Sequence, residues 1–386
     1  MLRIMWLCIL LLLSSLCFAE PLDVNLQREV NKLRIDYHLP ALSVSLQLPN
    51  ETQSHNFYSG YYDKLDKRPI DEKTLFQMGS ITKTFTAAII FQLIESGKIN
   101  LDDSITHYLP QYPQWQNIKI KNLLNHTSGV SNYSHGNAFD NSLRNQPQKV
   151  WTLEEVANIA YQHPNQSLPN KKYLYTNTDY ILLGMVIEKV TKTNLDTVFN
   201  HFFKKYGLSH TYYAGTAFPK NVYADIAHGY NQDGTFPFNS DVTAHSISSA
   251  KSAGGIISTP SDINHFLNLL FQNKIIPKRY LKQMLSFISP TSLQPVDMAD
   301  LRIPSKLNLD LFAECGIGQG LGLIYLKNLG YFLVHSGGMA GYESLYLYSP
   351  EKKLYLTLVY SLKPKSDFID LRIASDLLGI IYSELG

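Results

Sequence analysis

Ser80 and Lys83 stand where a predicted helix begins, and their types and spacing favour nucleophilic chemistry. They lie in the stretch Met78–Phe85, after which apolar residues recur at helical spacing as far as Leu93, and Gly97 follows as a stop signal. Residues i and i+3 share one face of a helix, so the Lys83 amine can approach the Ser80 hydroxyl and take its proton. The helix N-terminus adds unpaired N–H groups and a positive dipole end, which lower the pKa of a nearby ammonium and stabilise an oxyanion. The apolar spacing predicts that this helix buries one face.

Two other Ser-x-x-Lys patterns, Ser248–Lys251 and Ser349–Lys352, lack this context. Ser349 precedes Pro350 in an apparent turn, and Ser248 lies in a run of small residues. Neither serine opens an amphipathic helix, so we interpret both patterns as chance occurrences.

A second motif, Tyr175-Thr176-Asn177, comes just before another predicted helix. A phenol near an ammonium loses its proton more easily than a free phenol, so Tyr175 is a candidate proton shuttle. The amide of Asn177 can bind both Lys83 and a substrate carbonyl. The alternative interpretation is a buried tyrosine followed by a helix-capping asparagine.

A third motif, His335-Ser336-Gly337-Gly338, ends a predicted strand and enters what the sequence predicts to be a glycine-rich bend. An exposed edge strand at this point can pair with an extended peptide. Glycine allows close backbone approach, so the Gly338 N–H can join the Ser80 N–H as an oxyanion hole. The alternative is a turn with an incidental histidine.

In this order, the three motifs resemble those of the serine β-lactamase and penicillin-binding superfamily, in the branch of class C β-lactamases, D-alanyl-D-alanine carboxypeptidases and related esterases. The stretches Asn122–Gly129 and Ala253–Ile256 also look familiar, and we interpret them as scaffold without direct chemistry. The resemblance runs from about Val24 to the C-terminus.

The resemblance implies that Ser80 attacks a carbonyl and forms an acyl-enzyme, and that Lys83, directly or through Tyr175, accepts the serine proton. Tyr175 would then protonate the leaving group and activate the deacylating water. No metal or organic cofactor is implied. The substrate-binding positions implied by the resemblance are Asn177, His335, Ser336, Gly337 and Gly338.

His335 departs from the pattern, because β-lactamases of this branch carry lysine there. Unperturbed histidine has a pKa near 6.5 and is mostly neutral at pH 7. We therefore expect weaker attraction for a substrate carboxylate, which strengthens at acid pH. The departure favours a carboxypeptidase over a β-lactamase.

The composition excludes several classes of function. The chain has 386 residues, 45% hydrophobic, with 17% charged residues and a net charge of +2. It has no polybasic run, so neither nucleic acid nor an anionic membrane surface is an expected partner. The patterns Gly-x-Ser-x-Gly, His-Glu-x-x-His and Walker A are absent, which argues against an α/β-hydrolase elbow, a zinc site and a nucleotide site.

The N-terminus reads as an export signal. Arg3 precedes an apolar run from Ile4 to Leu13, and Cys17-Phe18-Ala19 presents the small residues of a cleavage site. We predict a signal peptide over 1–19 and a bacterial periplasmic or secreted protein; the alternative is an uncleaved membrane anchor. Cys8 and Cys17 leave with the signal, so Cys315 alone remains and no intrachain disulfide is possible.

The pattern along the chain predicts an α/β (α+β) fold of the β-lactamase/transpeptidase type in one domain, 20–386. An antiparallel sheet flanked by the terminal helices is built from about 22–75 and 250–386, and an all-α lobe from about 76–249, with the active site in the cleft between them. Predicted helices cover 24–37, 180–190, 195–206, a segment from Pro260 and 367–385; predicted strands cover 41–48, 55–62, 322–325, 331–335, 344–348 and 354–360.

The sequence thus predicts an exported serine hydrolase, of the D-Ala-D-Ala carboxypeptidase type, acting on cell-wall peptides. The alternatives are a class C-like β-lactamase, a small-ester esterase, and a peptidoglycan-binding protein with weak activity. The expected partner is a small-molecule or peptide substrate such as a D-Ala-terminated peptide, a β-lactam or an ester.

Overall fold

The computed structural model describes residues 21–385 except 135, 216–217, 219, 298–310 and 366–367. The predicted signal peptide, with Cys8 and Cys17, lies outside the described residues. Across the described ranges, no helix is both long and apolar enough to cross a bilayer. Cys315 is a free cysteine.

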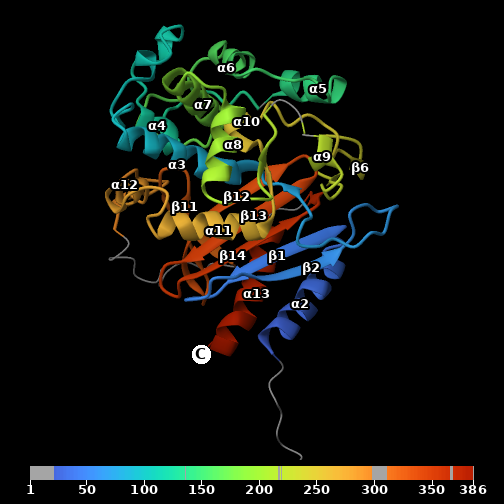
Figure 1. Ribbon diagram of the computed structural model, residues 1–386. Coiled ribbons are helices and arrows are strands. Elements are labelled where there is room, and N and C mark those ends of the chain that lie inside the picture. Colours follow the sequence, from blue (N-terminus) through green and yellow to red (C-terminus); the bar gives the residue numbers. More distant parts are fainter. Residues whose placement is uncertain are drawn as a thin grey trace, which may run out of the picture.

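A nine-stranded antiparallel sheet forms the centre of the protein, in the order β2-β1-β14-β13-β12-β11-β10-β8-β9 (Figure 1). The predicted hairpin near the N-terminus therefore lies beside the predicted C-terminal meander, with Ser45 opposite Thr357. The strands are β1 (Ala41–Gln47), β2 (His55–Gly60), β8 (Phe287–Ile288), β9 (Pro295–Val296), β10 (Phe312–Ile317), β11 (Gly322–Leu326), β12 (Gly330–Met339), β13 (Tyr342–Ser349) and β14 (Leu354–Tyr360).

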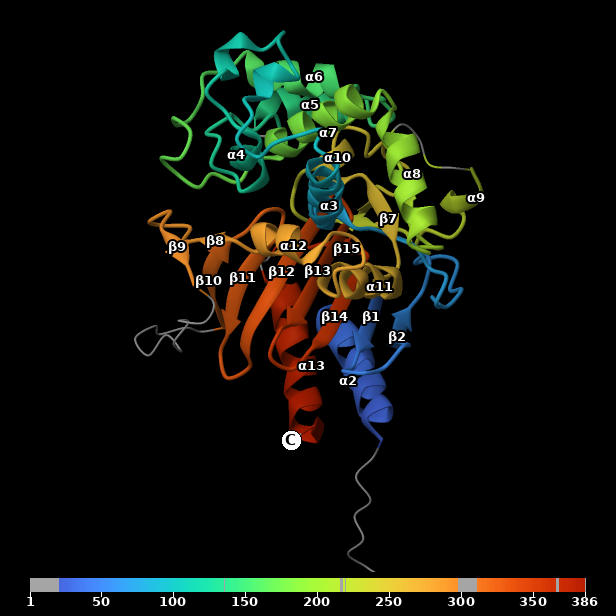
Figure 2. The same ribbon diagram turned by 60° about the vertical axis from the view of Figure 1, so that its left-hand side comes forward.

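Helices cover both faces of the sheet and enclose one apolar core on each face (Figure 2). The terminal helices α2 (Leu22–Asp36) and α13 (Ile369–Leu385) pack together on one face, as predicted. On the other face lie α11 (Pro260–Phe271) and α12 (Lys278–Met284). Thr259 caps α11, with Pro260 at its first position.

Strand β1 shows how an alternating sequence is buried on both faces. Leu42 and Val44 enter the core under α2 and α13. Ser45 faces α11, where the Asn264 amide donates to its carbonyl and hydroxyl at 2.9 and 3.1 Å. The Thr357 hydroxyl donates to the side-chain Oδ1 of Asn264 at 2.6 Å. The polar positions are thus satisfied by side chains of the protein, because buried polar groups need partners.

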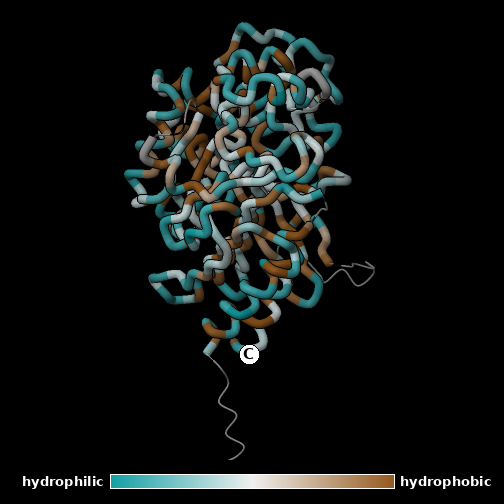
Figure 3. The backbone as a smooth tube through the Cα atoms, turned by 90° about the vertical axis from the view of Figure 1, so that its right-hand side faces the viewer, coloured by the Kyte–Doolittle hydropathy of each residue, from teal (hydrophilic) through white to brown (hydrophobic). Residues whose placement is uncertain are grey.

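The segment from Thr82 to Gly254 forms most of the expected helical lobe (Figure 1). A capping box at Thr152 and Glu155 opens one of its helices, α6. In the view by hydropathy, hydrophilic positions dominate the outer turns (Figure 3). The lobe contains α3 (Thr82–Glu95), α4 (Ile120–Leu124), α5 (Asn137–Asn145), α6 (Leu153–Tyr161), α7 (Asn177–Thr191), α8 (Leu195–Lys205), α9 (Lys220–Tyr223) and, just past its predicted limit, α10 (Lys251–Gly254).

Two small sheets join the lobe to the main sheet. One has the order β3-β7-β4 and the other β15-β5-β6. Their strands are β3 (Phe76–Gln77), β4 (Tyr212–Tyr213), β5 (Tyr230–Asn231), β6 (Ser240–Asp241), β7 (Ile256–Ser258) and β15 (Leu362–Lys363).

Helix α3 departs from the sequence prediction in its burial. The apolar spacing predicts one buried face, but every residue from Thr82 to Phe91 is buried. The reason is its position, because α3 contacts α7 and α10 of the lobe as well as α12. Its end is as predicted: the helix stops at Glu95, and Gly97 takes a positive φ of 70°.

Strand β12 is longer than predicted. The sequence analysis ends the strand at His335 and places a bend after it, but β12 continues to Met339 in register with β13. Glycine permits this because a Cβ at Gly337 would lie 2.0 Å from the Met78 carbonyl oxygen. Strand β11 begins opposite Val334, so within the described sheet residues 335–339 pair with β13 alone. The predicted open edge is therefore present.

Candidate active site

Lys83 is the geometric centre of the site. A short 3-10 helix, η1 (Gly79–Ile81), runs directly into α3, so Ser80 and Lys83 share one face. The Lys83 Nζ lies 2.9 Å from the Ser80 Oγ. It also lies 2.8 Å from the Asn177 Oδ1 and 2.8 Å from the Ala253 carbonyl oxygen. The last two atoms only accept hydrogen bonds, so they take two N–H groups and leave the third position of the amine facing the serine.

Lys83 is buried, and burial lowers the pKa of its amine well below the usual value. Ionisation of the Asp179 carboxyl would act in the opposite direction and raise the Lys83 pKa, but burial has the larger effect. A neutral amine carries a lone pair at its third position. In the neutral form of Lys83 this lone pair faces the Ser80 O–H, which is the arrangement of a general base.

Tyr175 packs between Lys83 and His126. The Lys83 Nζ lies 4.9 Å from the centre of the tyrosine ring, and the His126 ring centre lies 4.4 Å away. Although 40% of Tyr175 is exposed, crowding by protein atoms raises the pKa of its phenol, and the nearby Ser80 hydroxyl opposes this only in part. The prediction that Tyr175 loses its proton more easily is therefore wrong for the resting site. The reason is that burial of the phenol disfavours its charged form more than the Ser80 hydroxyl stabilises it.

Asn177 is the first residue of α7, whose cap is Thr176. Its Oδ1 accepts from Lys83, and its Nδ2 donates to the Ser134 hydroxyl at 3.0 Å. The backbone N–H of Asn177 donates to the Asn132 Oδ1 at 3.3 Å. The amide thus contacts Lys83 as the sequence analysis expects, and its binding of a substrate carbonyl stays a prediction.

His335 presents a hydrogen-bond acceptor to ligands. Its Nδ1 lies 2.6 Å from the Ser336 carbonyl oxygen, and because a carbonyl only accepts, Nδ1 carries the proton. Burial is the main cause that lowers the pKa of His335 to about 4, so the ring is neutral near pH 7. The lone pair of the neutral ring then lies on Nε2.

The glycines of β12 bring its backbone against the start of α3. Gly337 is buried, and a Cβ there would lie 3.0 Å from the Ser80 nitrogen. A Cβ at Gly79 would lie 2.9 Å from the Gly338 nitrogen. The structure therefore places both predicted oxyanion donors, the backbone nitrogens of Ser80 and Gly338, along one contact between η1 and β12.

A cavity of about 250 Å³ adjoins this constellation. Tyr175, His335 and Ser336 line it and connect it to the Ser80 side of the site, while Ser80 and Lys83 themselves are not part of its lining. The other polar or aromatic side chains of the lining are His126, Tyr173, Phe312, Glu314, Phe368 and Asp370.

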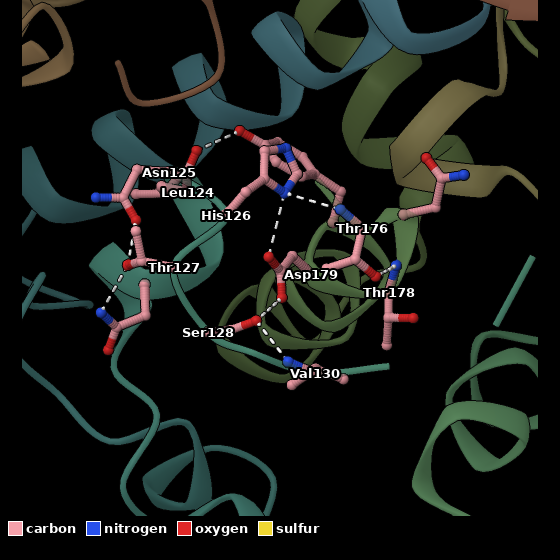
Figure 4. A network of polar contacts seen from close by, with 12 residues as sticks. Leu124, Asn125, His126, Thr127, Ser128, Val130, Thr176, Thr178 and Asp179 are labelled. Carbon is pink, nitrogen blue, oxygen red and sulfur yellow. Dashed lines mark hydrogen bonds and ion pairs between the residues drawn. The ribbon is translucent and has the colours of Figure 1, made fainter. Parts of the chain in front are cut away.

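A buried network of polar contacts around His126 and Asp179 adjoins the site (Figure 4). The His126 Nδ1 lies 3.1 Å from the Asp179 Oδ2, and the Ser128 hydroxyl donates to the Asp179 Oδ1 at 2.5 Å. Burial raises the pKa of Asp179 well above its usual value and lowers the pKa of His126 well below its own. These directions favour a pair that is neutral overall.

The sequence analysis assigned no chemistry to the segments that hold His126 and Ala253. The structure brings both into the site, His126 against Tyr175 and the Ala253 carbonyl onto Lys83. Asp179 was also missed, although it stands two residues after Asn177. Within the described ranges, no group of three or more His, Cys, Asp or Glu side chains is arranged to hold a metal ion.

The two other Ser-x-x-Lys patterns do not pair their residues. The Ser248 hydroxyl accepts from the Trp151 N–H at 2.9 Å, while the Lys251 Nζ donates to the Gly215 carbonyl at 2.6 Å. The Ser349 hydroxyl accepts from the backbone N–H of Lys352 at 3.1 Å, in a turn.

Comparison with known proteins assigns the chain to a family. The model of the family described as Beta-lactamase matches residues 26–378. The chain is 28% identical over 330 residues to Penicillin-binding protein 4* of Bacillus subtilis (strain 168), and this match covers 81% of the chain and 65% of that protein. It is 26% identical over 253 residues to a beta-lactamase of Providencia stuartii, covering 63% of the chain and 58% of that protein. The chain thus spans less than two thirds of the length of these relatives.

Solved structures share the fold. The D-amino acid amidase from Ochrobactrum anthropi SV3, complexed with L-phenylalanine, has 25% sequence identity and a TM-score of 0.79, with 95% of this chain and 99% of that chain covered. The octameric penicillin-binding protein homologue from Pyrococcus abyssi has 24% identity and a TM-score of 0.72, covering 92% of this chain and 77% of that one. The predicted fold class is confirmed.

Proposed function

The chain belongs to the beta-lactamase family, and from that premise we propose that Ser80 is the nucleophile of an acyl-enzyme hydrolase. The observation that carries the proposal is the coordination of Lys83, whose Nζ donates to the Asn177 Oδ1 and to the Ala253 carbonyl oxygen and lies 2.9 Å from the Ser80 Oγ. The family consists of serine hydrolases, and this geometry supplies the base that a serine needs.

The reaction follows from these positions. As the Ser80 Oγ bonds to the substrate carbonyl carbon, its proton passes to the Lys83 amine. The carbonyl oxygen becomes an oxyanion, which the Ser80 and Gly338 N–H groups stabilise. The C–N or C–O bond then breaks, and the leaving group takes a proton from Lys83 through the neutral Tyr175 phenol. A water molecule then attacks the carbonyl carbon of the acyl-enzyme, and the same groups carry its proton to the Ser80 Oγ. The ester bond to Ser80 breaks and the acid is released.

The substrate we propose is the amide bond of a D-amino acid peptide. The open edge of β12 beside Ser80 suits an extended peptide chain, because an unpaired strand edge offers main-chain hydrogen bonds. The three ordered motifs, which resemble those of D-alanyl-D-alanine carboxypeptidases, favour the carboxypeptidase form of this proposal, cleavage of a terminal D-alanine.

The neutral His335 favours a second candidate, an amide hydrolase whose leaving group carries no carboxylate. A carboxypeptidase must hold the terminal carboxylate of its substrate, and an Nε2 lone pair repels a carboxylate instead of binding it. An amide terminus carries N–H donors that suit this acceptor. The similarity to the D-amino acid amidase supports this candidate.

The test is covalent labelling of matched serine variants. We expect benzylpenicillin or a fluorophosphonate to add one acyl or phosphonyl group to the wild-type protein, as measured by intact mass. Ser80→Ala should lose the adduct and Ser248→Ala should keep it, since Ser248 has the same spacing to a lysine without the pairing. Circular dichroism should show both variants folded. Labelling that persists in Ser80→Ala would reject Ser80 as the nucleophile.

The same reaction mixtures separate the candidate activities. Slow loss of the penicillin adduct with release of D-alanine from a D-Ala-D-Ala peptide supports the carboxypeptidase. Preferential cleavage of the C-terminal amide of that peptide supports the amide hydrolase. Rapid release of penicilloate would identify a β-lactamase, and turnover of simple esters alone an esterase. Binding of peptidoglycan without any adduct would leave a binding protein.

A further inference from the structure

We infer that His126 is a positioning residue for the proton transfer to the leaving group, because it fixes the place of the Tyr175 phenol beside Ser80 and Lys83. The inference rests on the hydrolase function proposed above and deepens it. His126 acts through the tyrosine and not on the serine. A purely structural histidine would serve the fold of its loop and have no influence on which leaving group is expelled.

Tyr175 is a partly exposed ring whose orientation needs support. It comes directly before Thr176, the capping residue of α7, and 40% of it is exposed. Holding such a side chain in one orientation costs conformational entropy. A phenol that passes a proton must nevertheless keep its place, since a displacement of about 1 Å can lower a rate by about a hundredfold. The side chains that pack against the ring therefore decide whether the phenol is in position.

His126 contacts Tyr175 and both of its neighbours in the chain. The two ring centres lie 4.4 Å apart, and the ring planes are tilted by 43°. The backbone N–H of Leu174 donates to the His126 carbonyl oxygen at 3.0 Å, and the backbone N–H of Thr176 donates to the His126 Nδ1 at 3.4 Å. The Lys83 Nζ lies 4.9 Å from the centre of the Tyr175 ring. The tyrosine is thus held between the histidine and the base with which it exchanges protons.

His126 is itself held in place, as Figure 4 shows. It is 4% exposed and follows the end of α4 with a positive φ of 57°. The Asp179 Oδ2 lies 3.1 Å from its Nδ1, and the Ser128 hydroxyl donates to the other carboxyl oxygen. Because the Thr176 N–H only donates, Nδ1 is an acceptor, and the carboxyl of Asp179 carries the proton of the 3.1 Å contact. The loop after α4 and the start of α7 therefore meet at this ring, which supports the phenol.

The position of the phenol matters more for some leaving groups than for others. An amine must receive a proton as the C–N bond breaks, and in the proposed mechanism this proton comes from Lys83 through Tyr175. A 4-nitrophenolate is a weak base and leaves without a proton. Ser80 and Lys83 perform the attack in both cases. A displaced phenol should therefore slow the cleavage of an amide and spare that of the ester.

The experiment compares N-acetyl-D-alanine amide and N-acetyl-D-alanyl-D-alanine with N-acetyl-D-alanine 4-nitrophenyl ester. All three give the same acyl-enzyme, so the ratio of their kcat/KM values reports acylation alone. The test variant is His126→Asn, because asparagine accepts a positive φ and offers an amide to Asp179 and Thr176, but has no ring to pack on Tyr175. We expect kcat/KM for the faster amide to fall by about 10- to 100-fold and that for the ester to change by less than about twofold.

The matched control is Thr127→Ala in the same loop. Thr127 is as buried as His126, and its hydroxyl bonds to the side chains of Asn122 and Asn125, so the change should loosen the loop and leave the amide-to-ester ratio unchanged. Tyr175→Phe should lower the ratio, and His126→Asn should lower it no further in that background, since two changes that act through one group are not additive. Equal losses for amide and ester in His126→Asn, or a further loss in the double variant, would overturn the inference.

A measurement without turnover separates this inference from the hydrolase proposal. In protein labelled with ¹³C at the phenol carbon of tyrosine, the NMR signal that Tyr175→Phe removes belongs to Tyr175. This signal should shift in His126→Asn and keep its place in Thr127→Ala. If the wild type hydrolyses none of the three substrates but the signal behaves in this way, His126 still positions Tyr175 and the hydrolase proposal falls. A signal that His126→Asn leaves in place would overturn the inference even in an active enzyme.

Discussion

Replacing His335 with lysine should convert the site to one that accepts carboxylates. The pKa of His335 is about 4, so only about one molecule in a thousand carries the charge at pH 7. The lysine of His335→Lys has an ordinary pKa near 10.4 and is charged at that pH. An ammonium and a carboxylate at about 4 Å attract by about 4 kcal/mol at an effective dielectric constant near 20. Position 335 is only partly buried, so solvent screening and desolvation reduce this to about 1–2 kcal/mol.

The assay uses one peptide ending in D-Ala-D-Ala and the same peptide with a C-terminal amide. For His335→Lys, 1–2 kcal/mol corresponds to a rise of about 5- to 30-fold in the ratio of kcat/KM for the acid over the amide. In the wild type this ratio should rise only as the pH falls toward 4, because protonation of His335 supplies the charge. In the variant the ratio should stay flat between pH 5 and 8.

A neutral variant, His335→Gln, serves as the control and should leave the ratio at its wild-type value at pH 7. An unchanged acid-to-amide ratio in His335→Lys would refute the reasoning, since it would mean that the side chain at 335 does not meet the substrate terminus. A wild-type ratio that rises already near pH 6.5 would contradict the lowered pKa.

Two further pairs of substitutions test the supporting structure. Gly337→Ala should lower the free energy of unfolding by about 1–3 kcal/mol in urea titrations, because its Cβ would lie 2.0 Å from the Met78 carbonyl oxygen. The control is Gly379→Ala, in open space on α13, which should raise the free energy of unfolding by about 0.5–1 kcal/mol. Asp179→Asn should keep the stability and the activity close to wild type, because an amide reproduces a neutral carboxyl beside His126, while Asp179→Ala should lose about 1–3 kcal/mol. Equal losses in the Asn and Ala variants would show that the carboxyl is ionised.

The sequence predicted the parts of the site that local geometry determines. The spacing of Ser80 and Lys83 sets their contact because both lie within one continuous helical segment. Capping signals are equally local, which is why Thr259 and Pro260 located the start of α11. The order of strands followed from alternation and turns, since each strand of the C-terminal meander pairs with the next.

What the sequence could not predict depends on segments that meet only after folding. Ala253 binds Lys83 through a backbone carbonyl, which any residue type provides. The course of β12 through Gly337 looks like a bend in sequence, because glycine is depleted in strands. A residue without a side chain is required at position 337 because the Met78 carbonyl oxygen, which lies far away in the chain, comes close to it. The predicted direction of the Tyr175 pKa shift was also wrong, because burial of the phenol is a property of the assembled protein.

The contrast between Lys83 and Lys251 shows what turns a Ser-x-x-Lys spacing into a base. Both lysines are buried, and burial lowers the pKa of both amines. Helix α10 begins at Lys251, so Ser248 lies outside the helical turn and the two side chains share no face. Ser80 stands inside a turn that continues into α3, so its hydroxyl meets the amine. At Lys83 the contacts to the Asn177 Oδ1 and the Ala253 carbonyl oxygen fix the direction of the amine, so that its remaining position faces Ser80.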